Sequence, residues 1–363
     1  MKSVRKIIGV VVLIFAIISS LLLVIASYVQ YLSPAVMALP ALLGLAFPIV
    51  LCVTLFFFVL LLIIYPLYAL APLAALLLSI PAALQYCPIN GKSIKINTNR
   101  DTFTLLSYNV YHYVDIGVEP YEGELQYNRT LQYILDINAD IVALQEVSSV
   151  KYPSKRLNTT QEQIDKLNEL YPYRIYHNRN QVLSKYPIEL VMDTMYTKTA
   201  FTSVYKVDIN DRTLTLFNNH LESIGLNKDD KQLYKDITNG VDSIGAKVGG
   251  IKAFTRKFLT AFENRAHQVD CIDSLARQMG GDIIMCGDIN DTPNSYAYYR
   301  LKKGREDAFL EKGSGTGYTY KANRMWVRID HIIYDGELEA SYIEKGKKQY
   351  SDHYPILVEF EWR

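Results

Sequence analysis

A tract from Ile7 to Ile89 that contains no Asp, Glu, Lys, Arg or His most constrains how this chain can fold. A helix that spans a membrane needs about 20 apolar residues, so the tract is long enough for about three of them. Pro34, Pro40 and Pro66 mark the breaks between its apolar stretches. We therefore expect a transmembrane region over residues 1–89, with helices at 7–29, 41–64 and 67–84.

Basic residues precede this tract, at Lys2, Arg5 and Lys6, and the loops between the expected spans carry no charge. Positive charge beside a span marks its cytoplasmic end, so we expect the N-terminus in the cytoplasm. Two spans would return the polar remainder to the cytoplasm, where the basic residues between 92 and 100 satisfy the same rule. We expect three spans, and hence a multi-pass protein of the cell membrane with the lipid bilayer as partner and an extracytoplasmic polar domain.

The charge balance of the polar part argues against a broad nucleic-acid surface. The three N-terminal basic residues leave 35 of the 38 Lys and Arg against 37 Asp and Glu, so this part carries a net charge of about −2. Binding to a nucleic-acid duplex depends on a strongly basic face, although a local basic patch is compatible with this balance. Cys271 and Cys286 are its only cysteines and lack the spacing of a metal-binding pair.

Residues 90–100 form a polar connector, and residues 101–363 form the polar domain. Within that domain, the run from Gly280 to Asp291 has the pattern of a buried strand that ends in polar side chains. Asp288 and Asn290 are two residues apart, so on an extended chain they point to the same face, towards one ligand. Taken alone, the segment fits a strand followed by an Asp/Asn turn equally well.

Polar residues also stand at the ends of other expected strands, namely Asn109, Glu146, His220 and the pair Asp352-His353, and Asp330 lies within a further strand. One such residue by itself is more often a solvated or structural residue than a ligand. Alternation places Asp330 and His331 on opposite faces of a strand expected over 326–333, so only one of them can face a site.

Other segments have clear patterns of secondary structure. Residues 201–209 and 212–221 predict a hairpin with its turn at Asn210-Asp211. Residues 159–170 predict a helix that Thr159 or Thr160 caps, with Glu162 near the position that completes the cap. Helical spacing also appears over 127–138 and 265–279. Many short strands with interspersed helices predict an α+β layered domain.

The order of these motifs resembles the endonuclease/exonuclease/phosphatase superfamily, which includes pancreatic-type deoxyribonucleases, apurinic endonucleases and neutral sphingomyelinases. The resemblance covers residues 101–363 and rests on Asn109, Leu-Gln-Glu146, Asn-His220-Leu, Gly-Asp288-Ile-Asn290, Arg-Ile-Asp330-His and Ser-Asp352-His353. It implies a two-sheet β-sandwich flanked by helices, a four-layer α/β/β/α fold. The Trp-containing motifs of inositol polyphosphate 5-phosphatases are missing around Met285 and Met325, which disfavours that group.

The resemblance also implies a role for each motif residue. Glu146 would be the principal ligand of Mg²⁺ or Mn²⁺, with Asn109 beside it and Asp352 at or near the metal. His353, oriented by Asp330, would contact the scissile phosphate. Asp288 would lie near the attacking water, Asn290 would position the phosphate and His220 would donate to a phosphate oxygen. Either Asp288 or His353 could be the base. Four histidines match no motif and are expected to be structural: His112, His177, His267 and His331.

The sequence therefore predicts a membrane-anchored, metal-dependent phosphoester hydrolase, most directly a phosphodiesterase whose substrate is nucleic acid or phospholipid. Oxygen ligands without cysteine suit Mg²⁺ or Mn²⁺, and such a cation offsets the negative charge of a phosphodiester. The alternative is a non-catalytic membrane module that binds phospholipid or nucleic acid. A transport or assembly role for the spans is disfavoured because they carry no intramembrane charge.

Overall fold

The computed structural model describes residues 2–91, 93, 95, 101–115, 127–148, 157–226, 229–230, 232, 244–322 and 325–363. Two compact units make up the chain. The first comprises Met1–Pro88, Ile224–His267 and Thr292–Arg300, and the second comprises Ile89–Ser223, Gln268–Asp291 and Leu301–Arg363. Lys92 and Arg100, on which the two-span alternative depends, lie outside the described residues.

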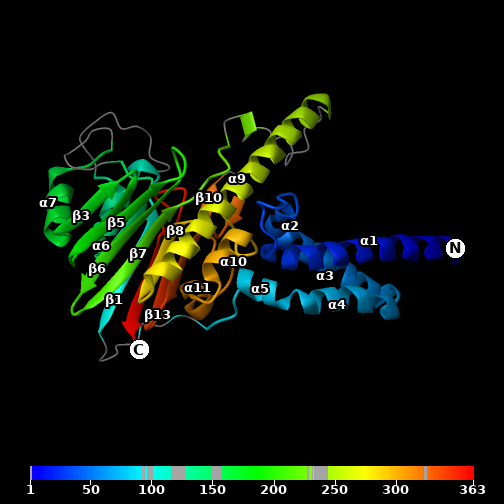
Figure 1. Ribbon diagram of the computed structural model, residues 1–363. Helices are drawn as coiled ribbons and strands as arrows, with labels where there is room; N and C mark the ends of the chain where they lie inside the picture. Colours follow the sequence, from blue (N-terminus) through cyan, green and yellow to red (C-terminus); the bar gives the residue numbers. More distant parts are fainter. Residues whose placement is uncertain are drawn as a thin grey trace. The chain divides into compact units, whose positions relative to one another are not determined.

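The N-terminal part of the first unit is helical (Figure 1). Its elements are α1 (Lys2–Tyr28), η1 (Val29–Tyr31), α2 (Ala41–Leu45), α3 (Phe47–Ile64), η2 (Pro66–Ala69), α4 (Leu70–Leu78) and α5 (Ile80–Tyr86). Large apolar side chains such as Leu21 and Ile63 are exposed on these helices. Buried hydroxyl groups bond to main-chain carbonyls of these helices: Thr54 Oγ1 donates to the carbonyl of Val50 in its own helix and to that of Ser19 in α1, at 2.9 and 3.1 Å. An apolar exterior with internally bonded polar groups is what a lipid environment requires.

Among the described residues, two helical stretches are long and apolar enough to cross a membrane, Gly9–Tyr31 and Phe47–Ile64. A third is possible if Pro66–Leu78 and Ile80–Tyr86, which meet at an angle of 51°, form one broken span. Pro81 stands in the first turn of α5, where its ring cannot continue the preceding helix. The helix expected over 41–64 is also interrupted, at Ala46 between α2 and α3.

The second unit contains two six-stranded mixed sheets. One has the order β13-β14-β1-β2-β4-β3 and the other β5-β6-β7-β8-β12-β9, while β10 and β11 form a separate pair. The strands of the first sheet are β1 (Thr102–Asn109), β2 (Ile141–Gln145), β3 (Tyr173–His177), β4 (Asn180–Ser184), β13 (Leu338–Lys345) and β14 (Ile356–Trp362). Those of the second are β5 (Ile188–Met195), β6 (Phe201–Ile209), β7 (Arg212–His220), β8 (Ile283–Asp288), β9 (Glu306–Asp307) and β12 (Asp330–Asp335). The pair is β10 (Tyr320–Ala322) and β11 (Met325–Val327).

The hydrophobic core lies between the inner faces of the two sheets. Leu105 and Ala143 of the first sheet belong to the same buried cluster as Leu216 and Ile284 of the second. A second cluster joins the outer face of the first sheet to α6 (Arg129–Ile137) and α7 (Gln161–Leu170). Other helices among the described residues include α9 (Ile244–Met279), α10 (Tyr296–Lys302), α11 (Ala308–Lys312) and the short η3 (Tyr111–Tyr113). The expected α+β fold, two sheets flanked by helices, is confirmed.

Two parallel strand pairs, each joined through a helix, bring the polar strand ends together. β1 and β2 flank α6, and Asn109 is aligned with Gln145 at their ends. β7 and β8 flank α9, and His220 is aligned with Asp288. A buried hydrogen bond from Gln145 Nε2 to Asn218 Oδ1 (2.7 Å) joins the two sheets one residue before these ends.

Three sequence expectations differ from the structure in detail. The strand expected over 326–333 is divided into β11 and β12, because Arg328 and Ile329 leave the extended pairing. The helix expected from residue 265 begins much earlier, at Ile244. Thr160 caps α7, and Gln163 rather than Glu162 completes the capping box.

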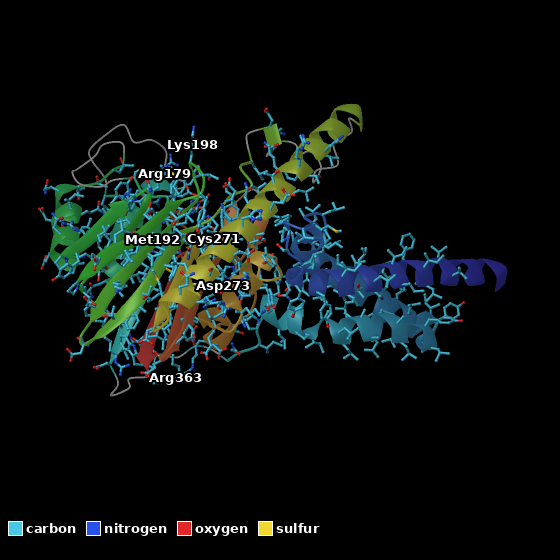
Figure 2. All side chains as sticks on the ribbon, in the orientation of Figure 1. Arg179, Met192, Lys198, Cys271, Asp273 and Arg363 are labelled. Carbon is cyan, nitrogen blue, oxygen red and sulfur yellow. The ribbon has the colours of Figure 1, made fainter. Side chains whose placement is uncertain are left out.

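Asp273, labelled in Figure 2, lies on the part of α9 that belongs to the second unit. It is fully buried and accepts a hydrogen bond from Arg305 Nη1 at 2.7 Å.

Candidate active site

Asp288 lies at the centre of the polar strand ends. It is the last residue of β8, and its Cα is aligned with that of His220 in β7 and with that of Asp330 in β12. Only 1% of its surface is exposed. The three residues therefore occupy one register position on three adjacent strands, which directs polar side chains to a common point.

Asn109 connects the two sheets at this point. Its Nδ2 donates to Oε1 of Glu146 and to Oδ2 of Asp288, each at 3.1 Å. Glu146 follows β2 directly and has a left-handed backbone with φ of 51°. Its side chain is 24% exposed, whereas those of Asp288 and Asp330 are buried. Glu146 is thus the carboxylate of this group that solvent ions can reach.

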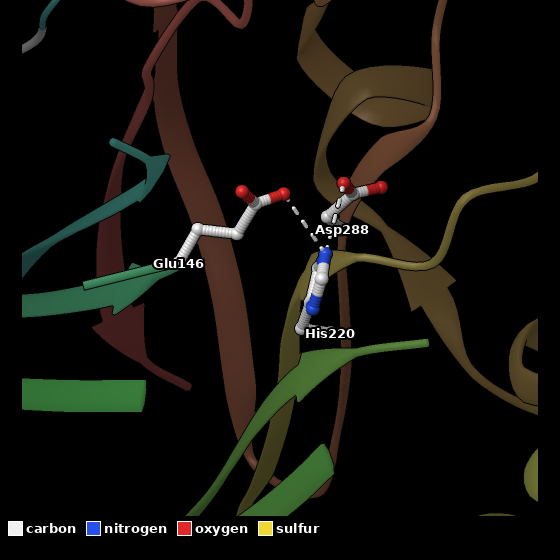
Figure 3. A group of neighbouring side chains, drawn as sticks. All are labelled: Glu146, His220 and Asp288. Carbon is white, nitrogen blue, oxygen red and sulfur yellow. Dashed lines mark ion pairs between the residues drawn. The ribbon is translucent and has the colours of Figure 1, made fainter. Parts of the chain in front are cut away.

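His220 lies between two carboxylates, those of Glu146 and Asp288 (Figure 3). Its Nε2 is 3.3 Å from Oε1 of Glu146 and 3.8 Å from Oδ2 of Asp288. Its Nδ1 donates to the carbonyl of Thr199 at 2.6 Å, which fixes the ring and leaves Nε2 facing the site. The two carboxylates raise the pKa of His220 although burial opposes the shift.

His353 lies between Asp330 and Asp288. Its Nδ1 is 2.8 Å from Oδ2 of Asp330, and its Nε2 is 3.6 Å from Oδ2 of Asp288. Burial lowers the pKa of His353, but the two carboxylates outweigh burial and raise it. Thr319 holds Asp330 in place, since its Oγ1 accepts hydrogen bonds from the backbone N–H groups of Ile329 and Asp330, both at 3.1 Å.

The carboxyl groups of the site differ in their tendency to ionise. Burial opposes ionisation of Glu146, but the hydrogen bond and charge of His220 outweigh it, and its pKa falls to about 2. Burial raises the pKa of Asp288, and the nearby positive charge of His353 opposes that rise. Glu146 is therefore the fixed anion, and Asp288 is the carboxyl group better placed to gain and lose a proton.

The structure also brings Asn290 and Asp352 to this region. Asn290 has a left-handed backbone, with φ of 54°, its N–H donates to Oδ1 of Asp288 (2.8 Å), and its Nδ2 donates to the carbonyl of Leu221 (2.9 Å). Asp352 accepts a hydrogen bond from Ser351 Oγ at 3.2 Å. Burial raises the pKa of Asp352, and the negative charge of Glu146 adds to that rise. All eight residues that the sequence singled out thus lie on adjoining strand ends and loops.

Gly287 allows the strands of the site to approach closely. Its φ of 119° is in a region that favours glycine, and a Cβ there would lie 2.1 Å from the carbonyl oxygen of Asn219. A side chain at this position would displace β7 or the adjacent Asp288.

Sequence reasoning missed several residues around the site. Nε2 of His112, expected to be structural, lies 3.7 Å from Oε2 of Glu146. The ring of Tyr320 lies 5.0 Å from that of His353, and Lys321 Nζ lies 5.0 Å from the exposed indole ring of Trp326. His331, on the opposite face from Asp330, is buried, and its Nε2 lies 3.2 Å from the carbonyl of Asp291.

The donor set suits a divalent cation. Ligand atoms of Glu146, His220 and Asp288 all lie within 4.8 Å of one another, and so do those of Asp288, Asp330 and His353. The two groups contain three carboxylates, one of which stays ionised and open to solvent. Hard oxygen donors of this kind favour Mg²⁺ or Mn²⁺.

Comparison with known proteins supports the same conclusion about family. Residues 106–353 match the family described as "Endonuclease/Exonuclease/phosphatase family", and residues 5–86 match a domain of unknown function. No curated protein matches the chain.

Three similar solved structures have low identity and TM-scores below one half. Truncated Caenorhabditis elegans TDP2 is 17% identical, covers 72% of this chain and 97% of its own, and has a TM-score of 0.46. An endonuclease/exonuclease/phosphatase from Beutenbergia cavernae is 12% identical, covers 72% of this chain and 72% of its own, and has a TM-score of 0.47. An endonuclease/exonuclease/phosphatase from Bacteroides vulgatus is 15% identical, covers 73% of this chain and 100% of its own, and has a TM-score of 0.40. The family match spans more than half of the chain, so this protein belongs to the endonuclease/exonuclease/phosphatase family.

Proposed function

We propose that this protein is a membrane-anchored, divalent-metal-dependent phosphoester hydrolase, most directly a phosphodiesterase that acts on nucleic acid or phospholipid. The observation that carries the proposal is a chain of contacts at one end of both sheets. Hydrogen bonds join Asp330 to His353 and Asn109 to both Asp288 and Glu146, and an ion pair of 3.6 Å joins His353 to Asp288. It combines an ionised carboxylate open to solvent with a buried histidine and carboxyl that can exchange a proton.

Glu146 and Asn109, with Asp352 nearby, would hold Mg²⁺ or Mn²⁺. When bound, the cation would offset negative charge on the phosphate that undergoes attack. Asn109 serves this arrangement by orienting Glu146, because its amide donates to Oε1 at 3.1 Å. Asp288 receives the second hydrogen bond of the same amide, so the ion site and the proton-transfer groups are held in one geometry.

Two groups can take the proton of the attacking water, Asp288 and His353. Their facing atoms are 3.6 Å apart, so the protonation of one group affects that of the other. Asp330 fixes the ring of His353 and stabilises its protonated form. His220 presents Nε2 to the same point, where in its protonated form it would donate to a phosphate oxygen. Asn290 would position the phosphate from the loop after β8.

The apolar helices would anchor the protein in the membrane. Two stretches among the described residues have the length and hydropathy of spans, and the bent pair would make the third that the sequence predicts. Three spans would place the hydrolase domain outside the cytoplasm.

The test uses the full-length chain in nanodiscs with three substrate groups in parallel: single- and double-stranded DNA, sphingomyelin and phosphatidyl lipids, and phosphoinositides. We expect hydrolysis of at least one group with Mg²⁺ or Mn²⁺, and its loss with EDTA. Binding of a substrate that EDTA does not affect, without hydrolysis of any, would replace the proposal with the binding-module alternative.

A further inference from the structure

The loop after β1 holds a second histidine against Glu146. Tyr111, His112 and Tyr113 all have left-handed backbones, with φ of 43°, 58° and 59°. Bulky side chains rarely adopt this conformation, and three in succession need support from their surroundings. The support here is direct: the N–H of Tyr111 donates to Oδ1 of Asn109 (3.2 Å), and the N–H of His112 donates to the carbonyl of Glu146 (2.7 Å).

This loop places an imidazole on each side of the Glu146 carboxylate. Nε2 of His220 is 3.3 Å from Oε1, and Nε2 of His112 is 3.7 Å from Oε2. The two histidines differ in exposure, because the side chain of His220 is 7% exposed and that of His112 is 36% exposed. His112, the more exposed of the two histidines, therefore contacts Glu146 through Oε2 at the solvent-accessible side of the site.

The separation of 3.7 Å is too long for a hydrogen bond between these two atoms. It suits two ligands of one ion, since nitrogen and oxygen ligands that each lie about 2.1 Å from a shared metal are about 3 to 4 Å apart. Neutral imidazole is a common metal ligand, and a nitrogen donor favours a first-row transition-metal ion such as Mn²⁺ over the harder Mg²⁺, which prefers oxygen ligands.

We propose that His112 is a nitrogen ligand of the cation held by Glu146, and that it gives the site a preference for Mn²⁺ over Mg²⁺. The inference rests on the metal role proposed above for Glu146. It extends that role to a residue outside the family motifs of this chain and predicts a mixed nitrogen and oxygen donor set.

The test is pulsed electron paramagnetic resonance of Mn²⁺ added to the metal-free, full-length chain in nanodiscs. Nitrogen bound to Mn²⁺ modulates the echo, and the modulation changes when the histidines are labelled with ¹⁵N. We expect histidine nitrogen modulation in the wild type and its loss or clear reduction in His112→Ala. His177→Ala is the control, because His177 is also exposed and its Nδ1 pairs with Asp193 at 3.0 Å.

A second variant separates ligand loss from disruption of the loop. His112→Asp supplies an oxygen ligand and tolerates the left-handed backbone. It should bind Mg²⁺ at least as well as the wild type, while Mn²⁺ affinity falls by about 10-fold and the nitrogen signal is lost. Unchanged nitrogen modulation in both His112 variants, or its disappearance only in His220→Gln, would overturn the inference and leave the proposed function standing. No specific binding of Mn²⁺ to the wild type would overturn both.

Discussion

Nδ1 of His353 and Oδ2 of Asp330 are 2.8 Å apart, and both side chains are almost completely buried. A buried histidine beside a carboxylate is held in one orientation and is more easily protonated. This pair sets the direction in which Nε2 of His353 faces, which is towards Asp288 at 3.6 Å.

Replacing Asp330 should therefore change the acidity of His353. Burial disfavours the imidazolium, and the carboxylates that oppose burial include Asp330, so Asp330→Asn should lower the pKa of His353. Turnover should fall by about 10²-fold or more, the usual scale for disturbing a group in proton transfer. Proton NMR titration of the His353 ring in metal-free protein measures the first effect directly.

Asp335→Asn is the matched control, because Asp335 ends the same strand and is exposed. It should leave both quantities unchanged. An unaltered His353 titration in Asp330→Asn would show that the observed 2.8 Å contact does not set the acidity of the ring.

Thr319 should prove to be a positioning residue. Its Oγ1 accepts two backbone hydrogen bonds in a buried loop, so Thr319→Val leaves two N–H groups without that acceptor. We expect the free energy of unfolding to fall by about 1–3 kcal/mol. Thr319→Ser, which keeps the hydroxyl, should restore most of the stability and activity. Equal melting temperatures for the Val and Ser variants would rule this role out.

Gly287 should not tolerate a side chain. Gly287→Ala would place Cβ 2.1 Å from the carbonyl oxygen of Asn219 in addition to the unfavourable φ of 119°. Gly280→Ala has an unfavourable backbone conformation, with φ of 60°, but no steric clash, because no atom lies within 4 Å of the added Cβ. We expect Gly287→Ala to lose activity and fold poorly, and Gly280→Ala to be destabilised by about 1–3 kcal/mol at most. Thermal unfolding and turnover of the two purified variants make the comparison.

Labelling of a native cysteine can show on which side of the membrane the second unit lies. Cys271 is exposed and belongs to the second unit, whereas Cys286 is buried. With Cys52 and Cys87 replaced by serine, three spans predict that a membrane-impermeant maleimide labels Cys271 in intact cells. Labelling only after the cells are permeabilised would favour two spans.

The residues that face the site were predictable because strand ends have a simple sequence pattern. A short apolar run followed by a polar residue located Asn109, Glu146 and Asp288, and the hairpin of β6 and β7 located His220. The alternation rule correctly separated Asp330 from His331. Each of these inferences needs only the two-residue period of a strand.

The residues that were missed depend on conformations that no simple period describes. His112 reaches Glu146 because three successive residues are left-handed, and the sequence there contains no glycine to suggest it. Lys321 and Trp326 meet through the short β10–β11 pairing, which lacks a long alternating pattern. The bend between α4 and α5 is likewise a tertiary feature, although Pro81 marks its position.

Metal-dependent turnover of a generic phosphodiester, bis(p-nitrophenyl) phosphate, by the full-length chain shows whether these strand ends form an active site. We predict that Glu146→Gln and His353→Ala each lower turnover by about 10²- to 10⁴-fold with melting temperatures close to that of the wild type. Glu169→Gln and His177→Ala, at exposed positions outside the set of site residues, should retain wild-type turnover. Full turnover in both site variants would contradict the account, because it would place the chemistry elsewhere in the chain.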